Sequence, residues 1–272
     1  MTETPRRWEP RELLELVESV ARAAGQTAAR YRESAQVAVT STKSSPTDVV
    51  TAADTAVEAQ IRAAVAEQRP FDAVVGEEGA DVSGTSGLRW VVDPIDGTVN
   101  YVYGSSRYAV SIGVEDDAGT LVAVVHAPAT GETFTAARGH GAWLDGRPIH
   151  VSDCGALAQA LVGTGFGYRV ERRRRQVEVL SAVVPLVRDI RRAGAAALDL
   201  CDVACGRLDA YYEQGLQPWD LSAGGLVASE AGAVVSGLRG GEPGEAMVVA
   251  AGPRLHTNLD LLLSDLDADR PS

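Results

Sequence analysis

A short apolar segment that runs directly into two aspartates constrains this chain more than any other feature. Residues 90–92 have the pattern of a buried strand, and Asp93, Pro94, Ile95 and Asp96 follow it at once. Because proline fixes φ and stiffens the turn, Asp96 should return close to Asp93. A helix that starts after this turn would offer free backbone N–H groups to a phosphate. Since carboxylates and phosphate both bind Mg²⁺ through oxygen, the segment predicts a metal and phosphate site at the end of a strand.

A purely structural interpretation of this segment is also open. Two aspartates three residues apart occur in Asp-rich turns and at helix N-caps, and the spacing alone favours such a turn. The same ambiguity affects Thr51 and Asp54, which match the pattern of a capping box at the start of a helix. Local patterns therefore do not decide between capping and chemistry.

Periodic patterns before residue 150 predict helices followed by an antiparallel sheet. Apolar residues recur at helical spacing in residues 13–24 and 53–65, and residues 73–75 form another short apolar strand. Three β-rich runs separated by turn residues lie within residues 108–136. Such runs are typical of an antiparallel meander.

After residue 150 the pattern alternates between strands and helices. Strands are expected at residues 160–164, 189–191, 210–213 and 246–250, and helices at residues 172–187, 196–204 and 220–231. Helices and strands in these proportions form stacked layers. We therefore expect an α+β protein whose two halves, residues 1–150 and 151–272, pack as one compact unit.

The composition is that of a globular protein with either an acidic surface or an acidic site. Apolar residues make up 45% of the 272 residues, and the formal net charge is −12. This charge argues against a nucleic-acid-binding surface, which is usually basic. Three cysteines do not make a disulfide framework, and the first helix is amphipathic rather than membrane-spanning. We expect a cytoplasmic protein that binds neither nucleic acid nor membrane.

Four segments together resemble the inositol monophosphatase family. The string DPIDGT at residues 93–98 looks like the family signature. The strings KSSPTDVVTAAD at residues 43–54, GEEG at residues 76–79 and WD at residues 219–220 match the same family in the same order. The resemblance spans nearly the whole chain and is closest to bacterial members of the actinobacterial type. It implies a layered α/β/α/β/α sandwich and, as the usual assembly, a homodimer.

The resemblance implies a two-metal site. Glu77, Asp93 and the Ile95 carbonyl would hold one Mg²⁺, and Asp93, Asp96 and Asp220 would hold a second. Two-metal sites place their ions about 3.5–4 Å apart. Four carboxylates this close would repel one another strongly without cations. The resemblance also implies inhibition by lithium, and the sequence leaves open whether a third, weaker ion binds near Glu77.

The same resemblance assigns catalytic roles to Thr98, Asp54 and Glu77. The Thr98 hydroxyl, with Asp54 behind it, would orient or deprotonate a water that one metal activates. The backbone amides of Gly97 and Thr98 would bind the phosphoryl oxygens. For Asp54 the family match favours this role over simple capping, whereas Thr51 stays structural.

The alcohol part of the substrate would lie against a second group of residues. Glu213 resembles the family's acceptor for inositol hydroxyls, and Gly194, Ala195 and Ala196 resemble the backbone segment that lines the ring, beside Asp220. A polyol is best recognised by such groups, because a buried hydroxyl without a partner is costly. The alternative for Glu213 is a surface residue after a strand.

Four further positions need comment. Lys43, the only lysine, and Glu78 would lie just behind the metal ligands, although Lys43 could also be a solvated loop residue. Ala195 stands where the family often has Ser or Thr, which could loosen hydroxyl recognition. Ser222 stands where Ala is usual, and we expect it to add a hydrogen bond to Asp220.

These features predict Mg²⁺-dependent hydrolysis of myo-inositol 1-phosphate to inositol and phosphate. The enzymatic alternative is a related phosphatase acting on histidinol phosphate, a sugar bisphosphate or a 3′-phosphonucleotide. A rival of another class is a regulatory homologue that keeps the fold without the chemistry. Loss of metal ligands would support that rival, and all four carboxylates are present here.

Overall fold

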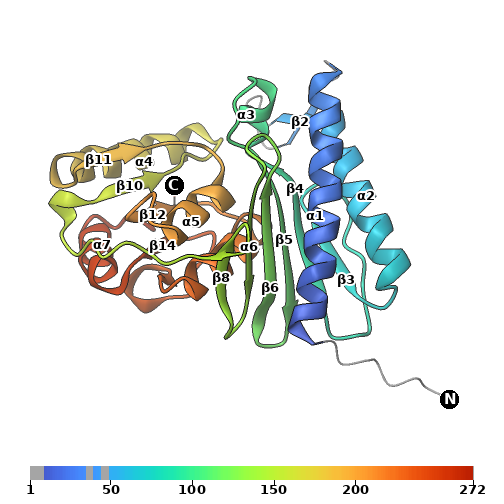
Figure 1. Cartoon of the computed structure of the whole chain (residues 1–272). Coiled ribbons are helices and arrows are strands. Elements are labelled where there is room, and N and C mark those ends of the chain that lie inside the picture. The colour runs from blue at the N-terminus through green and yellow to red at the C-terminus, as the bar shows by residue number, and fades with distance from the viewer. Residues whose placement is uncertain (1–8, 35–38, 44–48, 272) are drawn as a thin grey trace.

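Five alternating layers of helix and sheet make up the chain (Figure 1). The computed structural model describes residues 9–34, 39–43 and 49–271. Two helices cover a seven-stranded sheet, two more lie between this sheet and a five-stranded one, and a last pair covers the far face. The expected α/β/α/β/α sandwich is therefore confirmed.

The seven-stranded sheet contains all the strands from residue 73 to residue 148 in sequence order. They are β3 (Ala73–Gly76), β4 (Arg89–Asp96), β5 (Ala109–Asp116), β6 (Gly119–Ala127), β7 (Glu132–Ala137), β8 (Gly141–Leu144) and β9 (Arg147–Pro148). β3 runs parallel to β4, and every later pair is antiparallel, as the meander pattern predicted. β8 and β9 were not expected, because two to four residues are too short to show a period of two.

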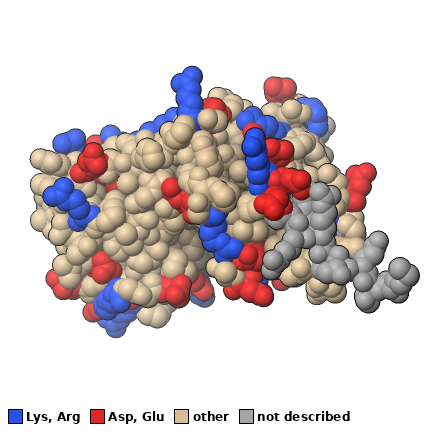
Figure 2. All heavy atoms as spheres, turned by 60° about the horizontal axis from the view of Figure 1, so that its bottom comes forward, with Lys and Arg blue, Asp and Glu red and all other residues tan. Residues whose placement is uncertain are grey.

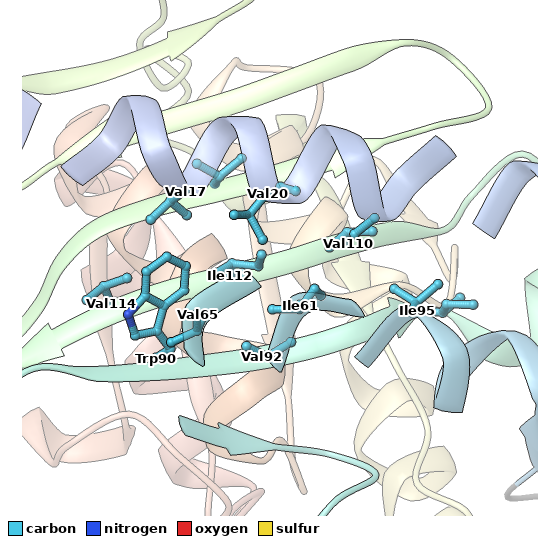
Figure 3. Packing of buried hydrophobic residues seen from close by; sticks show 14 of the residues in the cluster. Val17, Val20, Ile61, Val65, Trp90, Val92, Ile95, Val110, Ile112 and Val114 are labelled. Carbon is cyan, nitrogen blue, oxygen red and sulfur yellow. The ribbon is translucent and has the colours of Figure 1, made fainter. Parts of the chain in front are cut away.

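The outer helices pack on this sheet through the apolar stripes seen in the sequence. α1 (Pro10–Glu33) and α2 (Ala52–Gln68) lie side by side on one face. Figure 3 shows Val17 and Val20 of α1 above Ile112 of β5. Burial of such side chains contributes about 25 cal/mol per Å² of apolar surface, so this layer stabilises the sheet that contains β4.

The five-stranded sheet has the order β11-β10-β12-β14-β13. Its strands are β10 (Leu161–Thr164), β11 (Asp189–Arg191), β12 (Ala210–Glu213), β13 (Val234–Ser236) and β14 (Val248–Ala251). β10 pairs in parallel with β11 and β12, and β14 is antiparallel to β12 and β13. The strands expected in this half are present, and the three-residue β13 is an addition.

Helices fill the remaining layers. α5 (Ala196–Ala204) and α6 (Pro218–Glu230) lie between the sheets, and α4 (Val170–Val183) and α7 (Pro253–Asp265) cover the far face. The helix expected over residues 172–187 gives way to a 3₁₀ turn at Val184–Leu186. Pro185 explains this end, since proline lacks the N–H that an α-helix needs. α7 was not expected.

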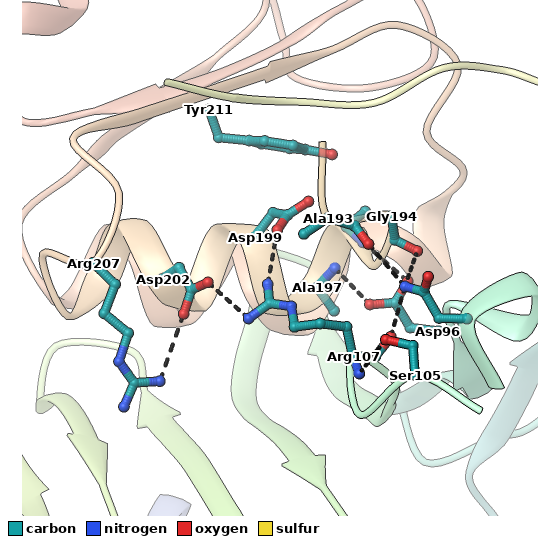
Figure 4. Close-up of polar contacts among 12 residues, drawn as sticks. Asp96, Ser105, Arg107, Ala193, Gly194, Ala197, Asp199, Asp202, Arg207 and Tyr211 are labelled. Carbon is teal, nitrogen blue, oxygen red and sulfur yellow. Dashed lines mark hydrogen bonds and ion pairs between the residues drawn. The ribbon is translucent and has the colours of Figure 1, made fainter. Parts of the chain in front are cut away.

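Arginines join the two halves of the chain around a group of carboxylates, of which Asp199 and Asp202 are buried and Glu132 is partly exposed (Figure 4). Arg107, which precedes β5, donates to Asp199 and Asp202 of α5, both at 2.8 Å. Arg207, which follows α5, pairs with Glu132 of β7 and lies 3.6 Å from Asp202. We call Glu132, Asp199 and Asp202 the bridged acids, because each has an arginine beside it.

Charges of both signs are intermixed on the face of the molecule drawn in Figure 2. Lys and Arg side chains alternate there with Asp and Glu side chains and with uncharged surface. Among the described residues, no helix is both long enough and apolar enough to cross a membrane.

Candidate active site

A cavity of about 390 Å³ opens where the end of β4 meets loops from the C-terminal half. Most of the expected site residues line it: Lys43, Glu77, Asp93, Ile95, Asp96, Gly97, Thr98, Gly194, Ala196, Glu213 and Asp220. Pockets of this size suit small ligands. Asp54, Glu78 and Ala195 do not line the cavity. Each lies next to a residue that does: Asp54 contacts Thr98, Glu78 contacts Lys43, and Ala195 precedes Ala196.

Four carboxylates converge on this cavity, and we call Glu77, Asp93, Asp96 and Asp220 the cavity acids. Gly76 of β3 pairs in parallel register with Val92 of β4. Parallel strands end at the same edge of a sheet, so Glu77 and Asp93 leave that edge together. Asp220 arrives in the first turn of α6, where its carboxylate accepts the Gln217 N–H at 2.7 Å.

Asp96 links the cavity to the C-terminal half. Its two carboxylate oxygens accept the N–H groups of Ala196 and Ala197, at 3.0 and 2.9 Å. These are free donors at the start of α5, and an anion there is favoured. Asp96 therefore fixes the 194–196 segment against the end of β4.

Burial and mutual repulsion disfavour the charged forms of the cavity acids. Burial raises the pKa of Asp93 well above its usual range, and the charges of Glu77, Asp96 and Asp220 raise it further. Burial raises the pKa of Asp96 to about 7, although the α5 amides oppose that rise. Burial also raises the pKa of Asp220 well above its usual value. These carboxylates would therefore be stabilised by a cation.

Lys43 supplies positive charge at one side of this group. Its ammonium lies 2.7 Å from Glu77 Oε1 and 2.6 Å from Glu78 Oε1. Burial raises the pKa of Glu77, and the Lys43 charge opposes this. Residues 44–48 of the segment that begins with Lys43 lie outside the described residues.

The carboxylate oxygens of the cavity are suitable ligands for a hard cation, although the side chains are not arranged in a coordination geometry. Within the described part of the chain, no three His, Cys, Asp or Glu side chains form a group that could hold a metal ion as they stand. The charge of Glu77 is one of the causes that raise the pKa of Asp93, so the two carboxylates lie close enough to repel each other. A divalent cation could relieve this repulsion, because carboxylate oxygens are its preferred ligands.

Thr51 and Asp54 form the expected capping box, and Asp54 also has a second contact. The Asp54 carboxylate accepts the Thr51 N–H at 2.7 Å, and Thr51 Oγ1 accepts from the first turn of α2. The Thr98 hydroxyl lies 3.3 Å from Asp54 Oδ1 and 3.0 Å from the Ile95 carbonyl oxygen. The two interpretations of Asp54 are therefore compatible, because its two oxygens serve different partners.

Two positioning residues escaped the sequence analysis. Glu58 of α2 is 2% exposed and accepts the N–H groups of Glu78 and Gly79, at 2.8 and 2.7 Å. It thereby fixes the loop that carries Glu77. Asn100 Nδ2 donates to the carbonyl oxygens of Ala193 and Gly194 (Figure 4). The one sequence signal for Glu58 was its position on the buried side of α2, where an acidic residue is unusual.

Of the residues expected to contact the alcohol part of the substrate, Glu213 lines the cavity and Ala195 does not. Glu213 at the end of β12 accepts the Tyr211 hydroxyl at 2.5 Å, and burial raises the pKa of Glu213. Ala195 is buried and faces away from solvent. The N–H of Ala196 is already used by Asp96. Glu213 is therefore a carboxylate of the cavity wall and not an exposed residue.

The expected hydrogen bond from Ser222 to Asp220 is wrong. Ser222 Oγ donates to Glu115 Oε1 at 2.8 Å and lies 3.1 Å from Thr120 Oγ1. Residues two apart on a helix do not face the same side. Ser222 therefore points at the seven-stranded sheet while Asp220 points into the cavity.

Comparison with known proteins identifies the family to which this chain belongs. The model of the inositol monophosphatase family matches residues 9–268. This chain belongs to the inositol monophosphatase family. The inositol-1-monophosphatase SuhB of Mycobacterium tuberculosis is 53% identical over 228 residues, which are 80% of this chain and 78% of that protein.

Other members of the family are similar over most of their length. The solved structure of Mycobacterium tuberculosis SuhB matches with a TM-score of 0.83 and 41% identity, and the match covers 97% of this chain and 100% of that one. A protein of Vibrio cholerae named Nus factor SuhB is 39% identical over 246 residues, which are 89% of this chain and 92% of that protein. The family thus includes members named as inositol-1-monophosphatases and members named as Nus factors.

Proposed function

We propose that this chain hydrolyses a small phosphate monoester with the help of Mg²⁺, and that myo-inositol 1-phosphate is its substrate. The observation that carries the proposal is the convergence of the four cavity acids on a cavity of ligand size. The name of the 53% identical mycobacterial relative supports the inositol substrate.

The cavity acids have the donor set for two ions. Glu77, Asp93 and the Ile95 carbonyl would hold one Mg²⁺, and Asp93, Asp96 and Asp220 would hold the other. Bound Mg²⁺ would lower the pKa of water and neutralise charge on the phosphate. The raised pKa values of Asp93 and Asp220 support this assignment, because a cation would relieve the repulsion that burial intensifies.

Thr98 and Asp54 would take up the proton of the attacking water. Thr98 has a single hydroxyl proton, which it can donate either to Asp54 or to the Ile95 carbonyl. If a cation were held by that carbonyl, the Thr98 proton would be donated to Asp54. The Thr98 oxygen would then accept a hydrogen bond from water, and Asp54 would be the final base.

The remaining wall would orient the substrate. The N–H groups of Gly97 and Thr98 open α3 (Thr98–Val102) and lack intrahelical partners, so they can donate to phosphoryl oxygens. Gly97 is in the left-handed region at φ 87°, which only glycine adopts freely. Glu213 would accept hydrogen bonds from ring hydroxyls. A homodimer and inhibition by lithium are further predictions for this member of the family.

A panel of phosphate esters tests the proposal. We expect purified protein with Mg²⁺ to hydrolyse myo-inositol 1-phosphate with a higher kcat/KM than histidinol phosphate or a 3′-phosphonucleotide. A clear preference for histidinol phosphate would reject the inositol substrate but keep the phosphatase. No turnover of any ester would instead favour a regulatory role, as the name of the Vibrio relative suggests.

A further inference from the structure

Glu213, which would accept hydrogen bonds from the ring hydroxyls, has two close contacts within the protein. Its Oε2 atom accepts the Tyr211 hydroxyl at 2.5 Å. Its carboxylate also lies directly against Gly165, which lines the same cavity. Within the described residues, Glu213 Oε1 has no hydrogen-bond partner. One oxygen of this carboxylate is therefore fixed by the protein, and the other remains for a ligand.

The contact with Gly165 depends on the absence of a side chain. A Cβ atom at this position would overlap the Glu213 carboxylate. Gly165 is not one of the glycines with positive φ, so its backbone conformation is open to alanine as well. The glycine therefore provides the space that the carboxylate occupies, and alanine at residue 165 would displace Glu213 without straining the main chain.

Tyr211 has little freedom to move. Its side chain is fully buried in the core cluster between α5 and the five-stranded sheet, and Figure 4 shows its ring above α5. Gly163 pairs with Tyr211 on the neighbouring strand β10, and a Cβ atom there would lie 3.2 Å from Tyr211 Cδ2. Closely packed core side chains keep one rotamer. The Tyr211 hydroxyl is therefore a donor with a fixed position.

The next residue along β12 provides a contrast. Successive side chains of a strand point to opposite faces of the sheet, so Glu213 shares a face with Tyr211 and not with Tyr212. Tyr212 is buried in the core cluster on the other face, together with Val162 and Leu259. Within the described residues, its hydroxyl makes no hydrogen bond to Glu213. The two tyrosines are therefore a matched pair that differ in their contact with the cavity wall.

A fixed Glu213 carboxylate would bind ring hydroxyls more tightly than a mobile one. A glutamate side chain loses rotamer freedom when it becomes ordered, and a side chain that is ordered only on binding lowers the affinity. Burial raises the pKa of Glu213, and the Tyr211 hydrogen bond opposes that rise. The Tyr211 hydroxyl thus orients the carboxylate and also favours its charged form, which accepts hydrogen bonds.

We propose that Tyr211 is a positioning residue for ring recognition and that it acts only through Glu213. The Tyr211 hydroxyl and Gly165 hold the Glu213 carboxylate so that Oε1 meets the ring hydroxyls. The proposal rests on the proposed function for the contact between Glu213 and the ring. It concerns the alcohol part of the substrate alone, so binding of the phosphate is unchanged.

Two esters that differ in their ring hydroxyls test this role. Cyclohexyl phosphate has the ring of myo-inositol 1-phosphate without the hydroxyls. In Tyr211→Phe, the KM for myo-inositol 1-phosphate should rise by about threefold to tenfold, with kcat within about twofold of the wild type. The KM for cyclohexyl phosphate, or its inhibition constant if turnover is slow, should stay the same. A purely structural role of Tyr211 would instead change the constants of both esters together.

Three further variants locate the effect. Tyr212→Phe removes the same atom from the next residue and should leave the constants of both esters unchanged. Gly165→Ala should reproduce the pattern of Tyr211→Phe, because it displaces the same carboxylate. Adding Tyr211→Phe to Glu213→Ala should cause no further rise in KM, since residues that act through one contact are not additive. Equal KM values in Tyr211→Phe and Tyr212→Phe, or additive effects in the double variant, would overturn the proposal.

A binding measurement separates this inference from the proposed function. Myo-inositol 1-phosphate can be titrated calorimetrically with Ca²⁺ in place of Mg²⁺, because Ca²⁺ takes the same oxygen ligands in a looser geometry. Weaker binding to Tyr211→Phe, but not to Tyr212→Phe, would support the role of Tyr211 even in a protein that hydrolyses no ester. Equal binding to both variants would reject this role even in an active phosphatase. A wild type that binds no myo-inositol 1-phosphate would reject both the role and the proposed substrate.

Discussion

This protein has two groups of buried or partly buried acidic side chains, and the two groups have different partners. The bridged acids each have an arginine beside them, as with Asp199 and Asp202 on the two nitrogens of Arg107. The cavity acids have no arginine partner at ion-pair distance among the described residues, and Lys43 reaches only Glu77 of the four. Carboxylates whose charge is neutralised by arginines link the two halves of the chain. Carboxylates without such partners would be stabilised by a bound cation.

The difference also appears in the proton affinities of the two groups. Among the bridged acids, the Arg207 hydrogen bond lowers the pKa of Glu132. Burial raises the pKa of Asp199 to about 8, but the Arg107 charge opposes that rise. Among the cavity acids, burial and neighbouring carboxylates act in the same direction on Asp93. The predictions below test this contrast.

The largest effect is expected for Asp93→Asn, which should lower kcat for myo-inositol 1-phosphate by at least about 10³-fold. Asp93 would contact both ions, so its loss disturbs the whole group. The melting temperature of the metal-free variant should equal or exceed that of the wild type, because a buried repulsive carboxylate is gone. Steady-state kinetics and thermal melting check both parts, and a variant with the wild-type rate would refute the site.

The opposite pattern is expected for Arg107→Met. This change leaves Asp199 and Asp202 without their cation, and breaking such a buried pair costs about 3–5 kcal/mol. Urea unfolding would measure the loss, while kcat per folded molecule should stay within about twofold, since Arg107 does not line the cavity. Arg174→Met is the control, with an expected change within about 0.5 kcal/mol. Equal stabilities of the two variants would show that the bridged acids do not need their arginine.

Glu58→Gln should raise the Mg²⁺ concentration for half-maximal activity by about tenfold, which corresponds to 1.4 kcal/mol. Glutamine has one acceptor oxygen where Glu58 uses two for the N–H groups of Glu78 and Gly79. The KM for the ester should stay the same. Glu67→Gln on the exposed side of α2 serves as the control. A lower melting temperature with unchanged Mg²⁺ dependence would limit Glu58 to a structural role.

In metal-free protein, the two groups should also change the unfolding free energy in opposite directions as the pH rises. The folded-state pKa of Asp96 is raised from 3.8 to about 7, so its contribution to stability is full below about pH 4 and is lost as the pH rises through 7. The pKa of Glu132 is lowered, so its contribution is present above its ordinary value of 4.5 and is lost as the pH falls.

Unfolding free energies measured from pH 3 to 8 check these slopes. Asp96→Asn should flatten the decline between pH 4 and 7, by at most about 1.4 kcal/mol per pH unit. Glu132→Gln should flatten the decline on the acid side. Curves for both variants that parallel the wild type would contradict the assignments.

Local patterns predicted most of the fold and drew attention to Asp93 and Asp96, whereas the assignment of Glu77 and Asp220 to the site came from the family resemblance. Asp93 and Asp96 were found because a buried strand runs directly into them, and the GEEG string placed Glu77 at the end of a neighbouring strand. The helix boundary before Pro185 was missed although proline is a direct stop signal. Short strands such as β9 and β13 carry too few residues for a periodic pattern.

Long-range partnerships could not be predicted from one sequence. Arg107 meets acids that lie 92 and 95 positions away, and no spacing rule connects them. Glu58 contacts amides about 20 positions away, on a different element. Ser222 was assigned to Asp220 from proximity in sequence, whereas helix geometry turns it towards Glu115. Such contacts depend on how the layers pack, which periodicity does not specify.

Calorimetric titration of metal-free protein with Mg²⁺ tests the central claim most directly. The account predicts saturable binding to the wild type, a melting temperature that rises with Mg²⁺ by an amount corresponding to about 2.7 kcal/mol at 100 times the dissociation constant, and loss of both effects in Asp93→Asn. Wild-type protein that neither binds millimolar Mg²⁺ nor gains stability from it would contradict the account.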